Sequence, residues 1–299
     1  MTRQDVLNIY KIHLDKIYPE VESRAIMLWV NDYIKNCSDS EFLEPITLDI
    51  QVVDDKLIED IPNILVEDIP NTKVFEALIR LLNFEPVQYV FQTAFFHKYQ
   101  FKVNSTTLIP RPETEELIEL ILQYNIHLQD SNILGLDIGT GSGCIPLTIL
   151  KEQHNWKFKA IDISEGALKI AQTNSIDLHV SNRIQFENCN ILERDMDFSH
   201  FHLIISNPPY IPYSELNKLD MNVTKYEPHI ALFTDSDPLI FYKRIAHLAT
   251  KSAQKGTQIW LETHQDYCEQ VAQLFEAVGT TTKIEDLSGN PRFVMCIKN

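Results

Sequence analysis

The 299-residue sequence is poor in glycine and in positive charge. It contains only eight glycines, and none precedes Gly135. Lys and Arg total 26 against 42 Asp and Glu, so the formal net charge is -16. A surface with this excess of negative charge repels a phosphate backbone, which makes nucleic acid a poor candidate for a direct partner. Any macromolecule that binds this protein is expected to present a basic face.

Paired cysteines and long apolar runs are also missing. The five cysteines are far apart, odd in number and never form a C-x-x-C pair, which argues against a disulfide framework and against a zinc knuckle. No run approaches the roughly eighteen apolar residues of a membrane span, and the N-terminus lacks the apolar segment of a signal peptide. We therefore expect a cytoplasmic protein with no metal site and no membrane partner.

The first 85 residues predict a small all-α domain. Apolar residues recur there at helical spacing, namely Val6, Tyr10, Leu14 and Ile17, then Ile26, Val30 and Tyr33, and later Val74, Leu78 and Leu81. Residues 63–69, between two prolines, fit either a loop or a short helix. From 86 to 110 aromatic and β-branched residues favour strands over helix, which predicts a β-hairpin linker.

Residues 111–299 predict an α/β domain. Short apolar runs alternate with helical stretches, and the runs occupy 133–138, 157–161, 183–187, 201–205 and 258–262. The helical stretches include 165–174, 238–253 and 266–278. This alternation predicts a doubly wound, Rossmann-like sheet with right-handed crossovers. Residues 280–286 and 292–297 read as a closing hairpin, which brings the number of strands to seven.

Three of the eight glycines fall within five residues, at Gly139, Gly141 and Gly143. They follow an apolar run and precede a helical stretch, and glycine lets a ligand approach the backbone N–H groups of such a turn. A plain strand-to-helix turn explains one glycine but not three. The third position of a dinucleotide-type G-x-G-x-x-G is Cys144, and no G-K-[ST] follows, so nicotinamide, flavin and P-loop nucleotides are disfavoured.

An acidic residue follows the glycine loop at the distance expected for a ribose contact. Asp162 lies nineteen residues beyond Gly143 and ends the second predicted strand. A carboxylate there can accept two hydrogen bonds from a ribose diol. Asp162 can instead begin a turn or cap the next helix, a role that Ser164 fills equally well. Asn190, after the third strand, fits either a contact with an adenine amino group or a turn.

The tetrapeptide Asn207-Pro208-Pro209-Tyr210 follows the fourth predicted strand, beside the crevice of a doubly wound sheet. The prolines fix the backbone, and the Asn207 side-chain oxygen and the Pro208 carbonyl then offer two acceptors to an NH2 group. A planar amide or aromatic amine nitrogen is a weak nucleophile. Two acceptors orient its lone pair and stabilise the positive charge that develops on it when it attacks an electrophile. Tyr210 is expected to stack on the planar group or to close the site.

Other polar residues carry weaker signals. His200 and His202 lie on one face of a strand, but no third metal ligand is near them in the sequence, so no metal site is predicted there. Glu262 and His264 end the fifth strand close to the crevice. They either position a substrate or form a buried structural pair.

Together these residues resemble the HemK/PrmC family, the protein-(glutamine-N5) methyltransferases that act on peptide chain release factors. The resemblance covers nearly the whole chain, with matching segments at 85–89, 108–115, 137–143, 207–210 and 226–228 and at Asp162. It implies a class I (Rossmann-like, seven-stranded) methyltransferase domain at 111–299. It also implies a small all-α N-terminal domain at 1–85 that recognises the substrate, joined through the β-hairpin linker at 86–110.

The resemblance further implies S-adenosyl-L-methionine as cofactor, with S-adenosyl-L-homocysteine as product. Its binding residues carry over to Gly139, Thr140, Gly141, Ser142, Gly143, Asp162, Asn190 and Asn207. The substrate is the glutamine of a Gly-Gly-Gln motif in a release factor, and its methylation modulates translation termination. The glutamine is held by Asn207, Pro208, Pro209 and Tyr210, of which Asn207, Pro208 and Tyr210 are the catalytic candidates. One departure is Asn190, where many relatives have Asp.

Two alternatives remain. An adenine-N6 methyltransferase of DNA or RNA uses a similar tetrapeptide to hold the amine of a flipped base, but it needs a positive groove. Here the first 85 residues carry 8 basic and 17 acidic side chains, a net of -9 (8 - 17), and the chain has no basic target-recognition segment. A binding or scaffold protein without activity is the second alternative, and the intact tetrapeptide gives no reason to prefer it.

Overall fold

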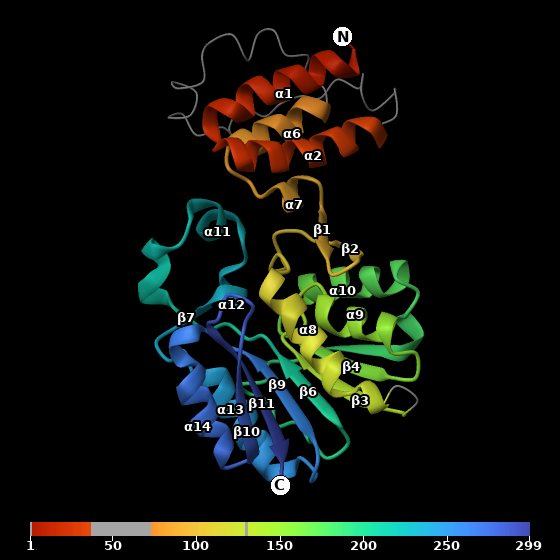
Figure 1. The fold of residues 1–299 in the computed structure, drawn as a ribbon, viewed down its shortest axis with the longest axis vertical. Coiled ribbons are helices and arrows are strands. Elements are labelled where there is room, and N and C mark those ends of the chain that lie inside the picture. Colours follow the sequence, from red (N-terminus) through yellow and green to blue (C-terminus); the bar gives the residue numbers. More distant parts are fainter. Residues whose placement is uncertain (1, 37–72, 129–130) are drawn as a thin grey trace. The chain divides into compact units, whose positions relative to one another are not determined.

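The computed structural model describes residues 2–36, 73–128 and 131–299 (Figure 1). The chain folds into two compact units. The first comprises Met1–Gln92 together with Met221–Tyr226, and the second comprises Thr93–Asp220 and Glu227–Asn299. The first unit thus extends past residue 85 and includes a later segment of the chain. The segment 63–69 lies outside the described residues.

The described part of the first unit is helical. It contains α1 (Arg3–Ile17), α2 (Glu20–Asn36), α6 (Lys73–Leu82), α7 (Val87–Val90) and α11 (Met221–Tyr226). Helix α1 begins with a capping box, in which Thr2 and Asp5 satisfy each other's backbone N–H groups. The predicted helical spacing is confirmed, because one apolar core buries Val6, Tyr10, Leu14, Ile26, Val30, Leu78 and Leu81.

The prediction of a strand from residue 87 is wrong at 87–90, which form the short helix α7. Pro86 begins this helix with φ at -53°, an angle that suits a helix start. The Arg80 guanidinium, which pairs with Glu85, donates to the carbonyls of Tyr89 and Val90. These bonds satisfy carbonyls at the end of the helix that a strand partner would otherwise have to satisfy.

The predicted β-hairpin is confirmed, and it begins at Thr93, after two residues that follow α7. Strand β1 (Thr93–Phe96) pairs antiparallel with β2 (Tyr99–Lys102). Alternation along the two strands turns Phe96 and Phe101 inward, where they join the core of the second unit. The hairpin is therefore part of the second unit's fold.

The second unit contains the predicted seven-stranded sheet. Its strands are β3 (Leu134–Ile138), β4 (Lys157–Asp162), β5 (Ile184–Asn188), β6 (Leu203–Ser206), β9 (Gln258–Glu262), β10 (Gly279–Glu285) and β11 (Pro291–Lys298). The spatial order is β10-β11-β9-β6-β3-β4-β5. Strands β5, β4, β3, β6 and β9 are parallel, and β11 pairs antiparallel with β9. The edge strand β10 pairs antiparallel with β11 and therefore runs in the same direction as the five parallel strands.

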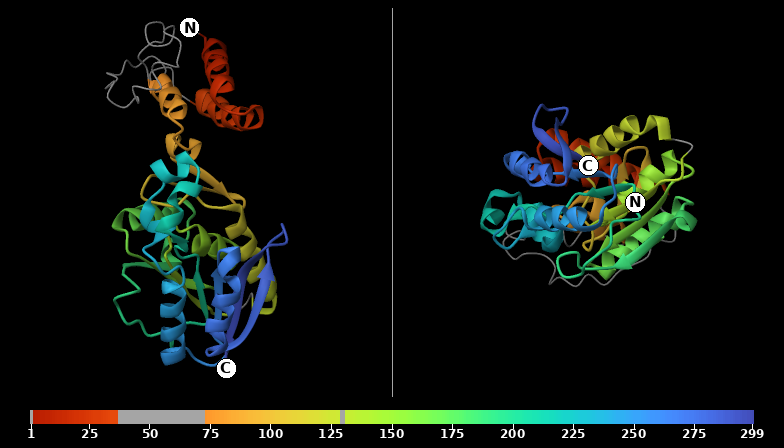
Figure 2. Two further views of the ribbon diagram at one scale, coloured as in Figure 1. Left: turned by 90° about the vertical axis from the view of Figure 1, so that its left-hand side faces the viewer. Right: turned by 90° about the horizontal axis from the view of Figure 1, so that it is seen from below.

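Helices cover both faces of this sheet (Figures 1 and 2). One face packs against α8 (Pro112–Tyr124) and α9 (Cys144–Glu152), with α10 (Glu165–Asp177) beside α9. The other face packs against α13 (Ile240–Ser252) and α14 (Cys268–Glu276). Alternation along β9 shows the two layers, since Trp260 faces the first core while Ile259 and Leu261 face the second.

The remaining elements are short. They are η2 (Ile126–Leu128), η3 (Ser181–Arg183), β7 (Ile211–Pro212), η4 (Tyr213–Lys218), α12 (His229–Leu232), β8 (Phe233–Thr234) and η5 (Gln265–Tyr267). None of the described helices is both long enough and apolar enough to cross a membrane.

The direction in which strands are added reverses between β3 and β6, because β4 follows β3 on one side and β9 follows β6 on the other. At such a switch point the loops leaving the carboxyl ends of the two strands separate and open a crevice. The glycine loop follows β3 and the tetrapeptide follows β6. The topology therefore places both sequence motifs at the same end of the sheet.

Candidate active site

The glycine loop joins β3 to α9 in a conformation that needs glycine. Gly139, Gly141 and Gly143 have φ values of +77°, +54° and +81°, in the left-handed region. A Cβ added at Gly139 or Gly141 would meet no atom within 4 Å, whereas one at Gly143 would lie 2.9 Å from Leu147. The first two glycines thus border open space, and the third packs closely against α9.

Asp162 ties the glycine loop to the end of β4. Its Oδ2 accepts from the Gly141 backbone N–H at 2.8 Å, and its Oδ1 accepts from the Ser164 N–H at 2.9 Å. Burial raises the pKa of Asp162, and the backbone N–H groups that it accepts from oppose the rise. The turn interpretation of Asp162 is confirmed, Ser164 rather than Asp162 caps α10 through the Ala167 N–H, and the ribose contact stays a prediction.

The tetrapeptide leaves the buried end of β6. Ser206, the last residue of that strand, donates from its hydroxyl to the Ile138 carbonyl of β3. Asn207, Pro208 and Pro209 then turn toward the crevice. Tyr210 packs against the core formed with α13 and α14, and its ring centroid lies 5.9 Å from that of His264. Burial is the main reason that the pKa of Tyr210 lies well above its usual value.

One pocket of about 240 Å³ brings the two motifs together. Of the residues predicted from the sequence, those that line it are Gly139, Gly141, Asp162, Asn190, Asn207, Pro208 and Pro209. Thr140 and Ser142 are buried members of the loop that do not line the pocket, and neither do Gly143 and Tyr210. The pocket therefore collects members of the glycine loop, the ribose candidate and the tetrapeptide in a single space.

Asn190 lines the pocket and also forms a turn. Its Oδ1 accepts from the Leu192 backbone N–H at 3.1 Å. This is the turn role that the sequence left open for Asn190. With one acceptor bond already made, the side-chain oxygen has a single lone pair left for a ligand.

Part of the pocket wall was not predicted. Thr106, Thr107 and Leu108 follow the hairpin and line the pocket, and so do Ile230, Ala231, Phe233 and Phe241. Glu227 holds the two wall segments together, since its buried carboxylate accepts from the Ile109 N–H at 3.2 Å and pairs with Arg111 at 2.5 Å. The resemblance marks both partners, 108–115 and 226–228, but nothing in the sequence shows that they meet.

Asp137 is a second feature that sequence reasoning missed. It lies within the apolar run of β3, is fully buried, and neither carboxylate oxygen has a hydrogen-bond partner among the described residues. Burial raises the pKa of Asp137 to about 7, the nearby Thr140 hydroxyl opposes the rise, and the Asp162 carboxylate adds to it. An acid in the middle of an apolar strand was the available signal.

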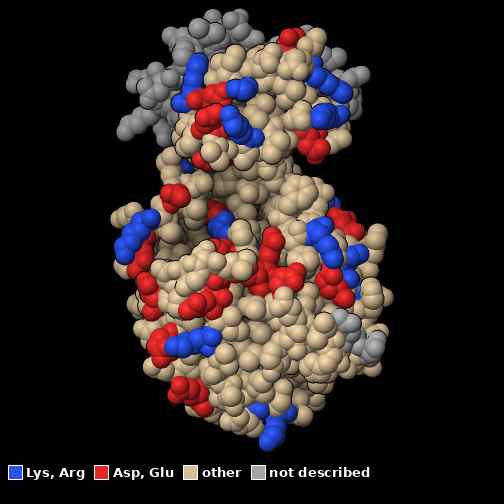
Figure 3. Space-filling model, viewed as in Figure 1, with Lys and Arg blue, Asp and Glu red and all other residues tan. Residues whose placement is uncertain are grey.

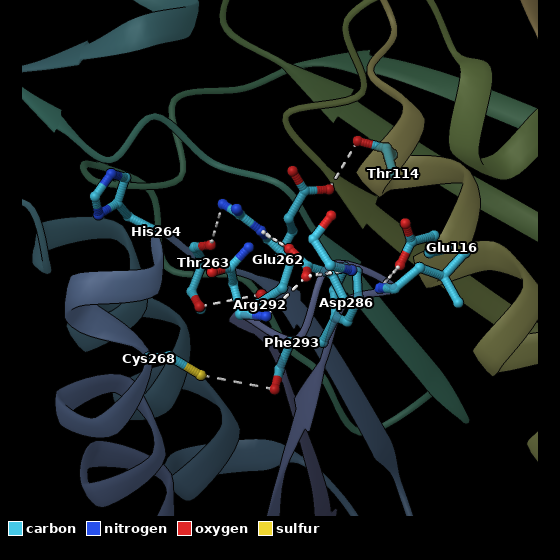
Figure 4. A network of polar contacts seen from close by, with 12 residues as sticks. Thr114, Glu116, Glu262, Thr263, His264, Cys268, Asp286, Arg292 and Phe293 are labelled. Carbon is cyan, nitrogen blue, oxygen red and sulfur yellow. Dashed lines mark hydrogen bonds and ion pairs between the residues drawn. The ribbon is translucent and has the colours of Figure 1, made fainter.

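Glu262 ends β9 inside a polar network (Figure 4). Its carboxylate accepts from the Thr114 hydroxyl at 2.7 Å. Burial raises the pKa of Glu262 to about 7, while Thr114 and the positively charged Arg292 oppose the rise. Arg292 in turn pairs with Asp286 at 3.2 Å.

The histidines weighed in the sequence have structural partners. The Nδ1 atom of His202 accepts from the Leu134 backbone N–H at 3.1 Å, which ties β6 to β3. His264 accepts from the Asp266 N–H at 3.2 Å and packs beside Tyr210. Within the described ranges no group of three His, Cys, Asp or Glu side chains lies close enough to hold a metal ion.

Comparison with known proteins agrees with this arrangement. A family model described as the methyltransferase small domain matches residues 119–224. The release factor glutamine methyltransferase of Flavobacterium psychrophilum is 40% identical over 221 residues, which are 73% of this chain and 77% of that protein. The enzyme of the same name from Bacteroides thetaiotaomicron is 34% identical over 285 residues, 94% of this chain and 95% of that protein.

A solved structure supports the fold. The hMettl16 catalytic domain, in complex with a hairpin of the MAT2A 3'UTR, matches with a TM-score of 0.51 at 17% identity. The match covers 66% of this chain and 74% of that one. At this identity the likeness shows the methyltransferase fold alone.

Proposed function

Because the chain belongs to the release factor glutamine methyltransferase family, we propose that it methylates the side-chain amide nitrogen (N5) of a glutamine in a peptide chain release factor, with S-adenosyl-L-methionine as methyl donor. The single observation that carries this proposal is the shared pocket. It joins a glycine loop open to a ligand with a tetrapeptide that offers two hydrogen-bond acceptors. A cytoplasmic location belongs to the same proposal.

The residues around the glycine loop fit the cofactor. The open space beside Gly139 and Gly141 lets a nucleoside approach the backbone, and Asp162 keeps lone pairs for a ribose diol beyond its two backbone bonds. Asn190 also lines the pocket, and we propose that it contacts the adenosine moiety of the cofactor. The unpaired Asp137 carboxylate would favour a cationic ligand at the loop. When bound, S-adenosyl-L-methionine supplies an electrophilic methyl group on its positively charged sulfur.

The tetrapeptide holds the nitrogen that is methylated. The Asn207 side-chain oxygen and the Pro208 carbonyl accept the two hydrogens of the glutamine NH2 group, which directs its lone pair toward the methyl donor. Both acceptors stabilise the positive charge that develops on the nitrogen. Holding two reactants in this way lowers the barrier by about 7 to 11 kcal/mol, so no strong base is required at the site. Tyr210 is half-buried and packs against the core at the end of the tetrapeptide, while stacking on the amide remains a prediction.

Charge favours a protein over a nucleic acid as substrate. On the face shown in Figure 3, acidic side chains gather over the N-terminal end of α8, and basic side chains are scattered among them. Glu113 and Glu115 stand in the first turn of that helix. A flipped base would need a positive surface to receive its phosphates, whereas a basic release-factor domain would be attracted. Residues 1–85 are proposed to provide much of this recognition.

The test is mass spectrometry of a purified release factor after incubation with the protein and S-adenosyl-L-methionine. One methyl group on the glutamine of the Gly-Gly-Gln motif is expected, and none on an adenine-containing oligonucleotide. Methylated adenine with unmodified release factor would replace this proposal by the nucleic-acid alternative.

Asn207→Ala tests the role of the tetrapeptide in the same assay. It should fold and bind the cofactor, but kcat should fall by about 100- to 1,000-fold, because one acceptor for the developing charge is lost. Near-normal kcat in this variant would reduce the tetrapeptide to a structural turn. Calorimetry with the cofactor and circular dichroism check that binding and folding are retained.

A further inference from the structure

Asn207 is the last member of a buried chain of polar contacts. Its Nδ2 donates to the Thr114 Oγ1 at 3.2 Å, and the Thr114 hydroxyl donates to the Glu262 Oε2 at 2.7 Å. The three residues come from three elements of the second unit, namely the end of β6, the first turn of α8 and the end of β9. Figure 4 shows Thr114 and Glu262 pointing toward each other from α8 and β9.

This chain has a direction. A threonine hydroxyl has one hydrogen, and the ionised Glu262 carboxylate, the form present above its raised pKa of about 7, can only accept. Once the Thr114 hydrogen is given to Glu262, the hydroxyl oxygen can only accept from its other neighbour. The amide group of Asn207 that faces Thr114 must then be its NH2 group, because the amide oxygen would bring two acceptors together with no hydrogen between them. The Asn207 oxygen is thereby left on the opposite side of the amide.

The chain is also held in place. Thr114 and Glu262 are 3% and 2% exposed, so water does not compete for their hydrogen bonds. The Glu262 backbone carbonyl accepts from the buried Tyr242 hydroxyl at 2.9 Å, which fixes the end of β9 against α13. Pro112 begins α8 and sets the first turn that carries Thr114.

We propose that Glu262, acting through Thr114, is a positioning residue that orients the Asn207 amide with its oxygen toward the substrate. The inference rests on the proposed function, in which that oxygen accepts a hydrogen of the glutamine NH2 group. A flipped Asn207 amide would present its own NH2 group to the substrate NH2 group, and the two donors would repel each other. Positioning of this kind raises the rate of methyl transfer without contributing to cofactor binding.

The test compares Thr114→Val, Thr114→Ser and Glu262→Gln in the full chain. Valine keeps the shape of threonine but has no hydroxyl, serine keeps the hydroxyl, and glutamine carries a donor that permits the chain to run in either direction. Single-turnover methylation of a release factor, KM for the release factor and calorimetric cofactor affinity are measured for each. Thr250→Val, on the exposed side of α13, is the matched control for the same substitution elsewhere.

Thr114→Val is expected to slow methyl transfer by about 10- to 100-fold, less than removal of the acceptor itself. Glu262→Gln should slow it by a smaller factor, and Thr114→Ser should restore most of the rate that valine loses. KM and cofactor affinity should stay within about threefold. Equal losses for valine and serine, or a normal rate for valine, would overturn the proposal. If valine prevents folding, the other two variants decide. A slowed Glu262→Gln beside a near-normal Thr114→Ser would support the proposal, and a normal rate for Glu262→Gln would overturn it.

A second measurement does not depend on activity. In the isotope-labelled full chain, the side-chain NH2 protons of Asn207 should exchange slowly with solvent in the wild type and in Thr114→Ser. They should exchange rapidly in Thr114→Val. Failure of the wild type to methylate a release factor, with this protection pattern intact, would refute the proposed function and leave the Asn207 orientation standing. Loss of the pattern would refute the orientation.

Discussion

The Asp162 carboxylate connects the backbone of the glycine loop to the pocket. Two of its lone pairs are occupied by the N–H groups of Gly141 and Ser164. The residue also lines the pocket. The same side chain therefore holds the glycine loop and is predicted to offer its remaining acceptor positions to a ligand.

Asp162→Ala is expected to weaken cofactor binding strongly. The loss of charge-assisted hydrogen bonds to a ribose costs about 1.5 to 3 kcal/mol, which is roughly a 10- to 150-fold rise in Kd. The released Gly141 N–H adds to this loss. Calorimetry measures the affinity, and Glu165→Ala, which removes an exposed carboxylate three residues away, should leave Kd unchanged. Unchanged cofactor affinity in Asp162→Ala would contradict the assignment of Asp162 to the ribose.

The buried Asp137 carboxyl should make stability depend on pH. Because its pKa is raised from 3.8 to about 7, the folded state holds a proton that the unfolded state has already released. The contribution of the Asp137 carboxyl to the free energy of unfolding is fully present below about pH 4 and is lost as pH rises toward 7. The shift corresponds to about 4 kcal/mol at most, since each pKa unit is about 1.36 kcal/mol.

The free energy of unfolding of Asp137→Asn should therefore increase relative to that of the wild type as pH rises from about 5 to about 8. Urea unfolding at several pH values gives the difference between the two free energies of unfolding. Asp235→Asn, which neutralises an exposed carboxylate, should show no such change. A constant difference between Asp137→Asn and the wild type across this range would contradict the buried, unpaired state of the carboxyl.

At the scale of elements, the sequence predicted the helices and strands that have several residues of regular apolar spacing. Five strands of the sheet were predicted from bounded apolar runs and two from the closing hairpin, and the places of all seven are confirmed. The four-residue helix α7 was missed because Val87, Tyr89 and Val90 favour a strand by residue type alone. Here tertiary bonds from Arg80 outweigh local preference.

The site was predictable where a motif lies at a strand end. The glycine loop, Asp162 and Asn207 follow β3, β4 and β6, so the topology alone gathers them. Thr106 to Leu108 and the contact of Thr114 with Glu262 were not predicted. They depend on how segments more than a hundred residues apart pack, and no periodicity in one segment records its partner in another.

Glu227 joins two segments that contribute to the pocket wall, one through Leu108 and the other through Ile230 and Ala231. Glu227→Ala would leave the buried Ile109 N–H unpaired and deprive Arg111 of its partner. We expect a loss of about 1 to 3 kcal/mol in stability, discounted from a fully buried pair because Arg111 is one-third exposed.

Urea unfolding measures this loss, and calorimetry should show weaker cofactor binding as well, because both wall segments lose their tie. Glu227→Gln keeps one acceptor and should lose less on both counts. If Glu227→Ala is destabilised but binds the cofactor normally, the Glu227 contacts stabilise the fold and do not shape the pocket.

At the scale of the molecule, the charge of the first unit bears on how the substrate is selected. A glutamine side chain offers too little surface for selective recognition, so specificity should come from a larger contact. A chain beginning at residue 86 would test this by deletion, but it would lack Asn83, whose carbonyl accepts from the Tyr226 hydroxyl of α11. The deletion would thus disturb residues 221–226 as well, and the full chain gives a cleaner test.

We therefore expect kcat/KM of the full chain for an intact release factor to fall as ionic strength rises. The first 85 residues carry a net charge of -9 (8 - 17), and the attraction to a basic partner is screened beyond about 10 Å at 0.1 M salt. A short peptide with the Gly-Gly-Gln motif should show little salt dependence.

Neutralising exposed acids of α2 in Glu22→Gln/Asp32→Asn should lower kcat/KM for the release factor at low salt. The pair Glu193→Gln/Glu276→Gln makes the same change of charge on the second unit and should have a smaller effect. Equal effects of the two pairs would show that net charge, not the first unit, guides the encounter. No salt dependence at all would remove the electrostatic basis of recognition.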